Sequence, residues 1–287
     1  MEMKINKTPL YHLMDTGKAR IWIKRDDLIP FSFGGNKVRI ASEFFKEAGR
    51  LGADTVISYG STSSNLNRVM AHMASFYGKK CIIITKKEDS GDNITFNERL
   101  IRETCAEIRY CTRDTVGDTV EKALEDVKSC GGVPCYIYGD RYGNGMEHVL
   151  RRAYSKVFEE ILVQEKELGV HFRSIFVTVG TGSTFYGLAE ACGESRGIRG
   201  ISVARDAFPD SRISCSYTCG GYGIYTPETE ALIKSMLTEY ALPLDPVYTG
   251  KAFCGMLKEL EKEDTEGDVL FIHTGGTPLL FDYLQRN

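Results

Sequence analysis

Short runs of β-branched and other apolar residues alternate along this chain with longer stretches of helical periodicity. The clearest apolar runs lie at residues 21–23, 55–58, 81–85, 134–138, 174–178, 201–203 and 268–272. Helical stretches follow several of them, at about 36–50, 64–77, 93–103 and 146–167. Continuous apolar runs are typical of parallel strands whose two faces are both covered. The alternation therefore predicts an α/β fold with parallel sheets flanked by helices.

The sequence has no obvious linker that would separate two domains. The 287 residues suffice for one large domain or two modest ones. No internal repeat, low-complexity segment or flexible linker rich in Gly, Ser and Pro divides the sequence. Two domains would therefore have to be interwoven.

Composition excludes several function classes. Apolar residues make up 42% and charged residues 26%, and the net charge is -3, so neither nucleic acid nor an anionic membrane is expected as a partner. No apolar run approaches the roughly 20 residues of a membrane span. The first residues lack the apolar core of a signal peptide. Together these features predict a cytoplasmic protein.

The nine cysteines do not form a recognisable site. Their number is odd, and none forms the two-residue-spaced pair of a zinc or thioredoxin-type motif. We expect reduced thiols that act as small buried hydrophobic residues, and no metal site. Cys215 and Cys219, in a loop rich in Gly and Tyr, are the one pair of interest.

The first loop with chemical potential contains Lys37. Gly34 and Gly35 precede this lysine, which stands at the predicted start of the helix 36–50. Two glycines let the backbone turn tightly and approach a ligand. In the first helical turn the helix dipole disfavours an ammonium group, and a free amine is what a Schiff-base nucleophile needs. Taken alone, this motif is better explained by a solvated surface lysine beside a loop.

A second glycine-rich turn follows the run 174–178. Its residues are Gly180, Thr181, Gly182, Ser183 and Thr184. A strand-to-helix turn of this kind directs backbone N–H groups at an anion. Phe185 stands where a dinucleotide fingerprint has its third glycine, and no Walker-type lysine follows. The hydroxyl groups suit a compact phosphate monoester, and a plain turn of small residues is the alternative.

Two more hydroxyl-bearing turns, at 61–65 and 273–278, follow predicted strands. Each alone would serve as a helix cap. Ligands of parallel sheets bind outside the carboxyl ends of the strands, so the four loops together predict a site for a small phosphorylated aldehyde held covalently by a lysine. Pyridoxal 5'-phosphate is the cofactor that fits.

The ordered motifs resemble the fold type II pyridoxal-phosphate enzymes, and within them the group of D-cysteine desulfhydrase and 1-aminocyclopropane-1-carboxylate deaminase. The matching segments are 8–10, 24–28, 34–37, 64–65, 180–184, 221–223, 245–251 and 273–276, which span nearly the whole chain. The resemblance implies two interwoven domains, each an open, mostly parallel sheet with flanking helices, as in the β-subunit of tryptophan synthase. Residues 1–42 and 149–287 would form the large cofactor-binding domain, with 43–148 inserted as the small domain. It also implies a homodimer.

The resemblance assigns cofactor-binding roles by matched position. Lys37 would carry the cofactor as a Schiff base and act as the main proton-transfer base. Asn65 would bond the 3-hydroxyl oxygen of the cofactor, and residues 180–184 would hold its phosphate. Thr274 would face the pyridine nitrogen, where a hydroxyl favours β-elimination or β-replacement over deeper carbanion chemistry.

The substrate side is assigned in the same way. Ser64, Tyr222 and Tyr248 match positions that bind the substrate carboxylate or shuttle protons, so they join Lys37 as candidate catalytic residues. Thr249, counted among the cofactor-binding residues, stands where the cyclopropane-opening deaminases have a glutamate at the ring nitrogen. It resembles the desulfhydrase branch, and we expect no cyclopropane ring opening.

Two departures from the family pattern concern the substrate. Leu66 follows Asn65, where the family usually has His or Gln, so a polar group near the substrate carboxylate is missing. The segment between Val203 and Tyr222 is shorter than in the family, as is the N-terminal approach to Lys37, and the loop 205–219 would lie over the site.

The leading hypothesis is a lyase that removes the α-proton of a small amino acid and expels a β-substituent. Alternatives on the same scaffold are β-replacement and racemisation. A protein that binds the cofactor without turnover is a third alternative, and a nicotinamide-dependent dehydrogenase is disfavoured by Phe185. The amino acid and its enantiomer stay open.

Overall fold

The computed structural model describes residues 3–86 and 94–286, and the chain forms two compact units. The small unit is Lys37–Arg152 together with residues 3 and 4, and the large unit is Ile5–Asn36 with Ala153–Asn287. The chain passes from one unit to the other within two helices, α1 (Asn36–Arg50) and α5 (Glu147–Leu168). Each unit is described by itself below. The assignment of folding domains at 1–42, 43–148 and 149–287 stays a proposal.

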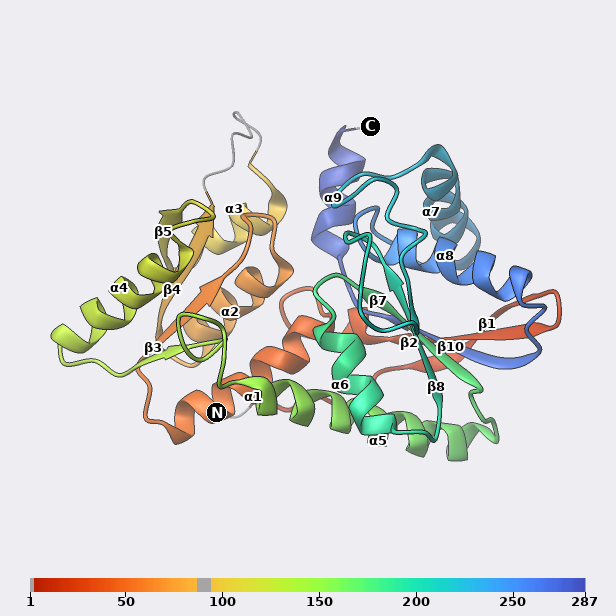
Figure 1. Cartoon of the computed structure of the whole chain (residues 1–287), viewed down its shortest axis with the longest axis horizontal. Coiled ribbons are helices and arrows are strands. Elements are labelled where there is room, and N and C mark those ends of the chain that lie inside the picture. The colour runs from red at the N-terminus through yellow and green to blue at the C-terminus, as the bar shows by residue number, and fades with distance from the viewer. Residues whose placement is uncertain (1–2, 87–93, 287) are drawn as a thin grey trace. The chain divides into compact units, whose positions relative to one another are not determined.

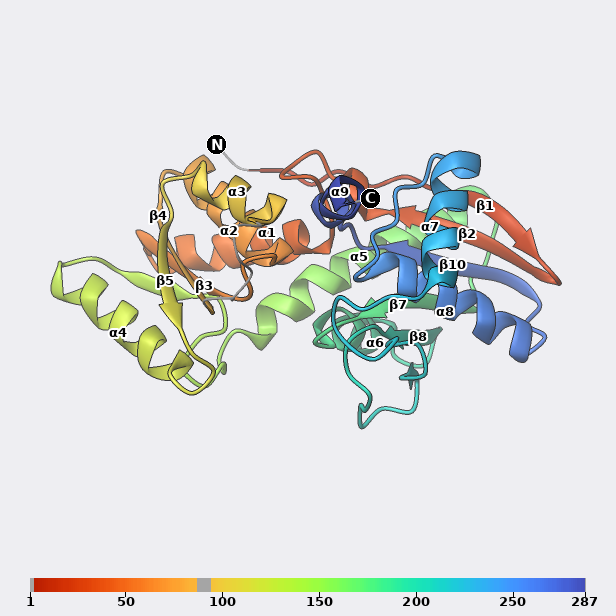
Figure 2. The same ribbon diagram turned by 90° about the horizontal axis from the view of Figure 1, so that it is seen from above.

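The large unit contains a six-stranded sheet in the order β1-β2-β10-β7-β8-β9. The strands are β1 (Leu10–Thr16), β2 (Ala19–Arg25), β7 (Ser174–Val179), β8 (Gly197–Ser202), β9 (Ile213–Ser214) and β10 (Gly267–His273). Figure 2 shows β1, β2 and β10 following one another across this sheet. Only β1 runs antiparallel to its neighbour, and the other pairings are parallel. The sheet is thus of the predicted, mostly parallel kind.

Helices cover both faces of this sheet (Figure 1). One face carries α5 and α6 (Ser183–Cys192), and the other carries α7 (Pro227–Tyr240) and α8 (Thr249–Lys262). The short helix η1 (Asp26–Leu28) follows β2, and α9 (Thr277–Arg286) follows β10. Alternate strand residues such as Ile21, Ile23 and Phe271 form one buried cluster with Phe253 and Met256 of α8. Burial of this apolar surface is the main stabilising contribution of the layer.

The small unit contains a four-stranded parallel sheet in the order β5-β4-β3-β6. Its strands are β3 (Thr55–Tyr59), β4 (Lys80–Lys86), β5 (Glu107–Cys111) and β6 (Pro134–Tyr136). The helix α2 (Asn65–Phe76) packs on β3 and β4 and also contacts α3 (Phe96–Arg102), while α4 (Val116–Ser129) contacts all four strands. The predicted helix at 93–103 corresponds to α3, and its first residue lies outside the described residues.

Within residues 3–86 and 94–286, no helix is long and apolar enough to cross a membrane. All nine cysteines have free thiols. Cys81, Cys111, Cys135 and Cys192 are buried, as small hydrophobic residues would be, whereas Cys105 and Cys130 are exposed.

Candidate active site

The turn before Lys37 requires its two glycines. Gly34 and Gly35 have φ angles of 64° and 96°, in the left-handed region that glycine adopts without strain. A Cβ atom on Gly34 would lie 2.0 Å from the carbonyl oxygen of Asp27, and one on Gly35 would lie 2.7 Å from that of Thr274. The close packing of three backbone segments thus sets the path by which the chain enters α1.

Lys37 is the second residue of α1, and its side chain is half-buried. Burial lowers the pKa of Lys37 from its ordinary value of 10.5 to about 8. Its ammonium group has no hydrogen bond or ion pair with any residue that the structure describes. A desolvated amine without a carboxylate partner is poised to react as a nucleophile near neutral pH.

The glycine-rich turn after β7 presents an open helix N-terminus. Gly182, with a φ of 98°, precedes the first residue of α6, and no described side chain caps this end. The first backbone N–H groups of a helix lack partners within the helix, and the helix dipole favours an anion there. The hydroxyls of Thr181 and Ser183 lie 3.2 Å apart beside them. This combination suits a phosphate group.

The hydroxyl of Thr184 is already engaged. It accepts a hydrogen bond from the side-chain amide of Asn36 at 2.8 Å and lies 2.7 Å from the hydroxyl of Tyr154. The backbone N–H of Asn36 donates to the carbonyl oxygen of Thr274 at 3.0 Å. The residue directly before Lys37 is thereby fixed to both the glycine-rich turn and the turn after β10. The hydroxyl oxygen of Thr184 is thus held by two side chains, and its backbone N–H stands in the first turn of α6.

Tyr248 and Tyr222 form a pair of phenols. Their hydroxyl oxygens lie 3.3 Å apart and their rings meet edge to face, with centroids 5.8 Å apart. The ring of Tyr248 also lies beside Gly180, where an added Cβ would contact it at 3.3 Å. Burial raises the pKa of Tyr248 well above its usual value, so this phenol keeps its proton. Tyr222 is 47% exposed.

Thr249 is fully buried and bound to Asp245, a residue for which the sequence suggested no role. The Thr249 hydroxyl donates to Asp245 Oδ2 at 2.7 Å, and Oδ1 of the same carboxylate accepts from the backbone N–H groups of Val247 and Tyr248 at 2.9 and 2.7 Å. A Cβ on Gly276 would lie 2.2 Å from Asp245 Oδ2. Asp245 therefore fixes the start of α8 against the turn after β10. An Asp four residues before a helix is a local signal that could have revealed it.

A buried histidine directly precedes Thr274 in the turn after β10. His273 is fully buried, and its Nδ1 accepts a hydrogen bond from the backbone N–H of Gly275 at 3.2 Å. Its Nε2 therefore carries the hydrogen and donates to the carbonyl oxygen of Pro243 at 3.2 Å. Burial lowers the pKa of His273, so the ring stays neutral. The hydroxyl of Thr274 has no partner among the described residues.

Ser64 and Asn65 form the start of α2 in the small unit. Ser64 is the N-cap, and its hydroxyl oxygen accepts from the backbone N–H of Asn67 at 3.2 Å, which leaves its own hydrogen for donation. The side-chain oxygen of Asn65 accepts from Arg68 and Asn97. The neighbouring Leu66 is buried, so it offers no polar group.

The predicted residues therefore fall into two groups. Lys37, Ser64 and Asn65 belong to the small unit. The large unit brings together residues 180–184, Tyr222, Tyr248, Thr249 and Thr274 through the contacts described above. Taken by itself, the amine of the small unit suits an aldehyde, because it has no carboxylate partner among the described residues. Taken by itself, the uncapped helix end of the large unit, with two hydroxyls beside it, suits a phosphate. Each group thus fits one part of the predicted cofactor.

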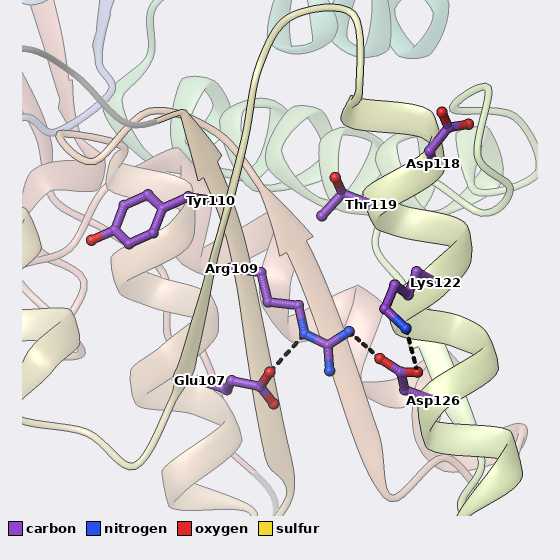
Figure 3. Close-up of a pocket in the computed structure, with 7 residues that line it drawn as sticks. All are labelled: Glu107, Arg109, Tyr110, Asp118, Thr119, Lys122 and Asp126. Atoms are coloured by element: carbon purple, nitrogen blue, oxygen red, sulfur yellow. Dashed lines mark hydrogen bonds and ion pairs between the residues drawn. The ribbon is translucent and has the colours of Figure 1, made fainter.

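A groove of about 520 Å³ in the small unit contains none of these residues (Figure 3). It lies between β5 and α4, and its walls are Glu107, Arg109, Tyr110, Asp118, Thr119, Lys122 and Asp126. Arg109 reaches from Glu107 to Asp126, which also pairs with Lys122. These charges neutralise one another at the surface, where such pairs contribute little. In the described part of the chain, no three His, Cys, Asp or Glu residues could hold a metal ion.

Comparisons with known proteins bear on this arrangement. The family model described as pyridoxal-phosphate dependent enzyme matches residues 1–218. A putative 1-aminocyclopropane-1-carboxylate deaminase of Pyrococcus abyssi is 30% identical over 309 residues, which cover 96% of this chain and 91% of that protein. D-cysteine desulfhydrase of Yersinia pestis is 30% identical over 316 residues, with 97% of this chain and 94% of that protein covered.

Among solved structures, an ACC deaminase homologue superposes with a TM-score of 0.83 at 28% identity, covering 98% of this chain and 92% of that one. The family match confirms the resemblance, the fold class and the cofactor predicted from the sequence. The chain belongs to the family of pyridoxal-phosphate-dependent enzymes.

Proposed function

We propose that this chain is a lyase that removes the α-proton of a small amino acid and expels a substituent from its β-carbon, in the manner of a D-cysteine desulfhydrase. The observation that carries the proposal is Lys37, an amine with a pKa of about 8 and no described partner, on the glycine turn of a chain in this family. The names of its relatives, D-cysteine desulfhydrase among them, support the substrate class.

When bound, pyridoxal phosphate supplies an aldehyde that condenses with amines and a ring that accepts electrons from the α-carbon. Lys37 would hold the aldehyde and, once displaced by the substrate amine, take the α-proton on its Nζ. Because its pKa is about 8 rather than 10.5, the unprotonated fraction at neutral pH is roughly 300-fold higher than for an ordinary lysine. The amine is therefore available as a base.

The remaining residues bind and orient. The backbone N–H groups at the start of α6 and the hydroxyls of Thr181 and Ser183 would hold the phosphate. Ser64, whose hydroxyl hydrogen is not used by its cap, would donate to the substrate carboxylate. Thr274 would face the ring nitrogen with its hydroxyl.

Tyr248 would act as a proton donor and not as a base, because burial keeps its phenol protonated. Tyr222, at 3.3 Å, would exchange that proton with the exposed side. A thiolate that leaves the β-carbon takes the bonding electrons and needs one proton. The net reaction converts cysteine and water to pyruvate, ammonia and hydrogen sulfide, so no oxidant is required.

Thr249 supports elimination over cyclopropane ring opening. Its hydroxyl is held by Asp245 in a fully buried position, so no carboxylate at residue 249 is present to keep a proton on the ring nitrogen. We therefore assign this chain to the desulfhydrase branch, although relatives carrying both names are similar to it.

The test is a substrate screen on purified, cofactor-loaded protein. D-cysteine, L-cysteine, their O-acetylserine analogues and 1-aminocyclopropane-1-carboxylate are assayed for pyruvate, sulfide and ring-opened product. We expect sulfide and pyruvate in equal amounts from one enantiomer of cysteine. Lys37→Ala should abolish both turnover and borohydride trapping of the cofactor, whereas Lys46→Ala, an exposed change on the same helix, should alter neither. Full activity in Lys37→Ala would refute the assignment.

A cytoplasmic homodimer completes the proposal. The absence of a membrane-spanning helix within the described residues is compatible with it. Sedimentation equilibrium of the loaded protein tests the stoichiometry, and cell fractionation tests the location. A monomer at micromolar concentration, or recovery in the membrane fraction, would contradict this part.

A further inference from the structure

We infer that Asn97 and Arg68 are positioning residues that fix the side-chain amide of Asn65, so that its nitrogen and not its oxygen is offered to the cofactor. The inference rests on the proposed function, in which Asn65 meets the 3-oxygen of pyridoxal phosphate. All three residues belong to the small unit.

The oxygen of Asn65 is occupied by two donors. Arg68 Nη1 donates to Asn65 Oδ1 at 2.7 Å, and Asn97 Nδ2 donates to the same atom at 3.0 Å. A guanidinium has donors only, so the atom that faces Arg68 has to be an acceptor. Burial lowers the pKa of Arg68 to about 9, which still leaves the group charged at neutral pH.

The orientation of Asn97 is determined by the same logic. Its Oδ1 accepts from Arg68 Nη1 at 2.8 Å, and its Nδ2 donates to the carbonyl oxygen of Ser63 at 2.6 Å as well as to Asn65. If the Asn97 amide were turned over, its nitrogen would face the donor Arg68 Nη1, and its oxygen would face two acceptors, the carbonyl oxygen of Ser63 and Asn65 Oδ1. Because Asn97 is fully buried, water cannot relieve such a mismatch.

One donor is left over. The side-chain nitrogen of Asn65 makes no hydrogen bond with the residues that the structure describes. An ionised 3-oxygen accepts hydrogen bonds, so an amide nitrogen stabilises it, whereas an amide oxygen would repel it. Arg68 follows Asn65 by one helical turn of α2 and Asn97 comes from α3, which packs on α2. The contact between two helices thus decides the polarity of a cofactor ligand.

Two substitutions at Asn97 and one at Asn65 test the inference. In Asn97→Asp the new carboxylate sets an acceptor against Asn65 Oδ1, where an amide had donated, while Arg68 still donates to that oxygen. The Asn65 amide should therefore no longer be held in one orientation. Asn97→Ala removes the Nδ2 donor to Asn65, and it replaces Asn97→Asp as the test variant if that protein does not fold. Asn65→Asp keeps both hydrogen bonds, gains an ion pair with Arg68 and so should fold at least as stably, yet it offers an acceptor to the cofactor. Asn67→Asp, an equally buried change whose side chain bonds Ser58 and the carbonyl of Ser61, is the matched control.

The readouts are the absorbance spectrum of the bound cofactor, its dissociation constant and the melting temperature of the apoprotein. Relative to wild type, we expect the Asn97 variants and Asn65→Asp to shift the absorbance to shorter wavelength, because the 3-oxygen becomes protonated. The cofactor dissociation constant should rise about tenfold or more. Asn67→Asp should lower the melting temperature and leave the spectrum in place.

Folded Asn97→Asp and Asn97→Ala proteins with the wild-type spectrum and affinity would overturn the positioning role. If only Asn65→Asp shifts the spectrum, Asn65 contacts the cofactor without help from Asn97, which also overturns it. Wild-type protein that takes up no cofactor would instead refute the proposed function.

Discussion

The ammonium group of Lys251 donates a hydrogen bond to the carbonyl oxygen of Gly221 across 2.8 Å. It also donates to the carbonyl oxygens of Val203 and Thr218, at 2.6 and 2.9 Å. The side chain is 1% exposed, so its three protons meet three backbone acceptors instead of water. Gly221 directly precedes Tyr222, and the lysine therefore holds the backbone from which that phenol extends.

Substituting Lys251 by Met should loosen this loop. Three buried carbonyl groups lose their donor, and we expect the free energy of unfolding to fall by about 3 kcal/mol. Turnover should decrease at least about tenfold more than cofactor affinity, because Tyr222 is displaced while the phosphate-binding turn is kept. Urea unfolding and cofactor titration measure the two effects. The control is Lys258→Met, an exposed change on the same helix that removes an ion pair with Glu228. It should change the free energy of unfolding by less than about 0.5 kcal/mol. Equal effects of the two variants would contradict the role of Lys251.

Cofactor uptake by the apoprotein should depend on pH through Lys37. Burial lowers the pKa of this lysine to about 8, so the reactive free amine is a minor fraction below that pH and the main form above it. The rate of uptake, followed by absorbance, should rise through pH 8 and level off by about pH 9. A rate that keeps rising to the ordinary lysine value of 10.5 would show that the amine is solvated.

The glycine before α6 should not tolerate a side chain. In Gly182→Ala the φ of 98° strains the backbone, and the Cβ would lie 2.8 Å from the ring of Tyr186. We expect a loss of about 2–3 kcal/mol in unfolding free energy and about a tenfold weaker binding of cofactor. Gly169→Ala has a positive φ but no atom within 4 Å of the new Cβ, so it should lose about 1 kcal/mol and keep its affinity for the cofactor. Equal cofactor affinities of the two variants would argue against a phosphate at this turn.

Introducing a glutamate at residue 249 should not create a ring-opening deaminase. Thr249 is fully buried and bonded to the Asp245 carboxylate, so Thr249→Glu would bury a second carboxylate beside the first. We expect a loss of about 3 kcal/mol or more in stability and no consumption of 1-aminocyclopropane-1-carboxylate. Thr249→Ser keeps the hydroxyl and should remain within about 1 kcal/mol of wild type. A stable Thr249→Glu protein that opens the ring would refute this reasoning.

Edge strands of both sheets escaped the sequence analysis, although the run 134–138 did predict β6, which also lies at an edge. The apolar runs at 55–58 and 268–272 correspond to β3 and β10, which lie inside their sheets. The strands β1 and β5 lie at sheet edges, where exposed positions carry polar residues and no continuous apolar run forms. A continuous apolar run reports burial on both faces, so it identifies central strands and buried edge strands such as β6 but misses edge strands with exposed residues.

For the candidate site, the sequence by itself determined the elements that depend on neighbouring residues: the glycine turn before Lys37, the turn 180–184 and the Ser64 cap of α2. These three features follow from backbone preferences and from hydrogen bonds between residues close in the sequence, so the local sequence predicts them. The tertiary structure alone decided that Lys37 is desolvated and that Lys251 meets three carbonyls from 30 to 48 residues away. Burial and long-range hydrogen bonds arise from packing between distant segments, and no local pattern encodes which segments will meet.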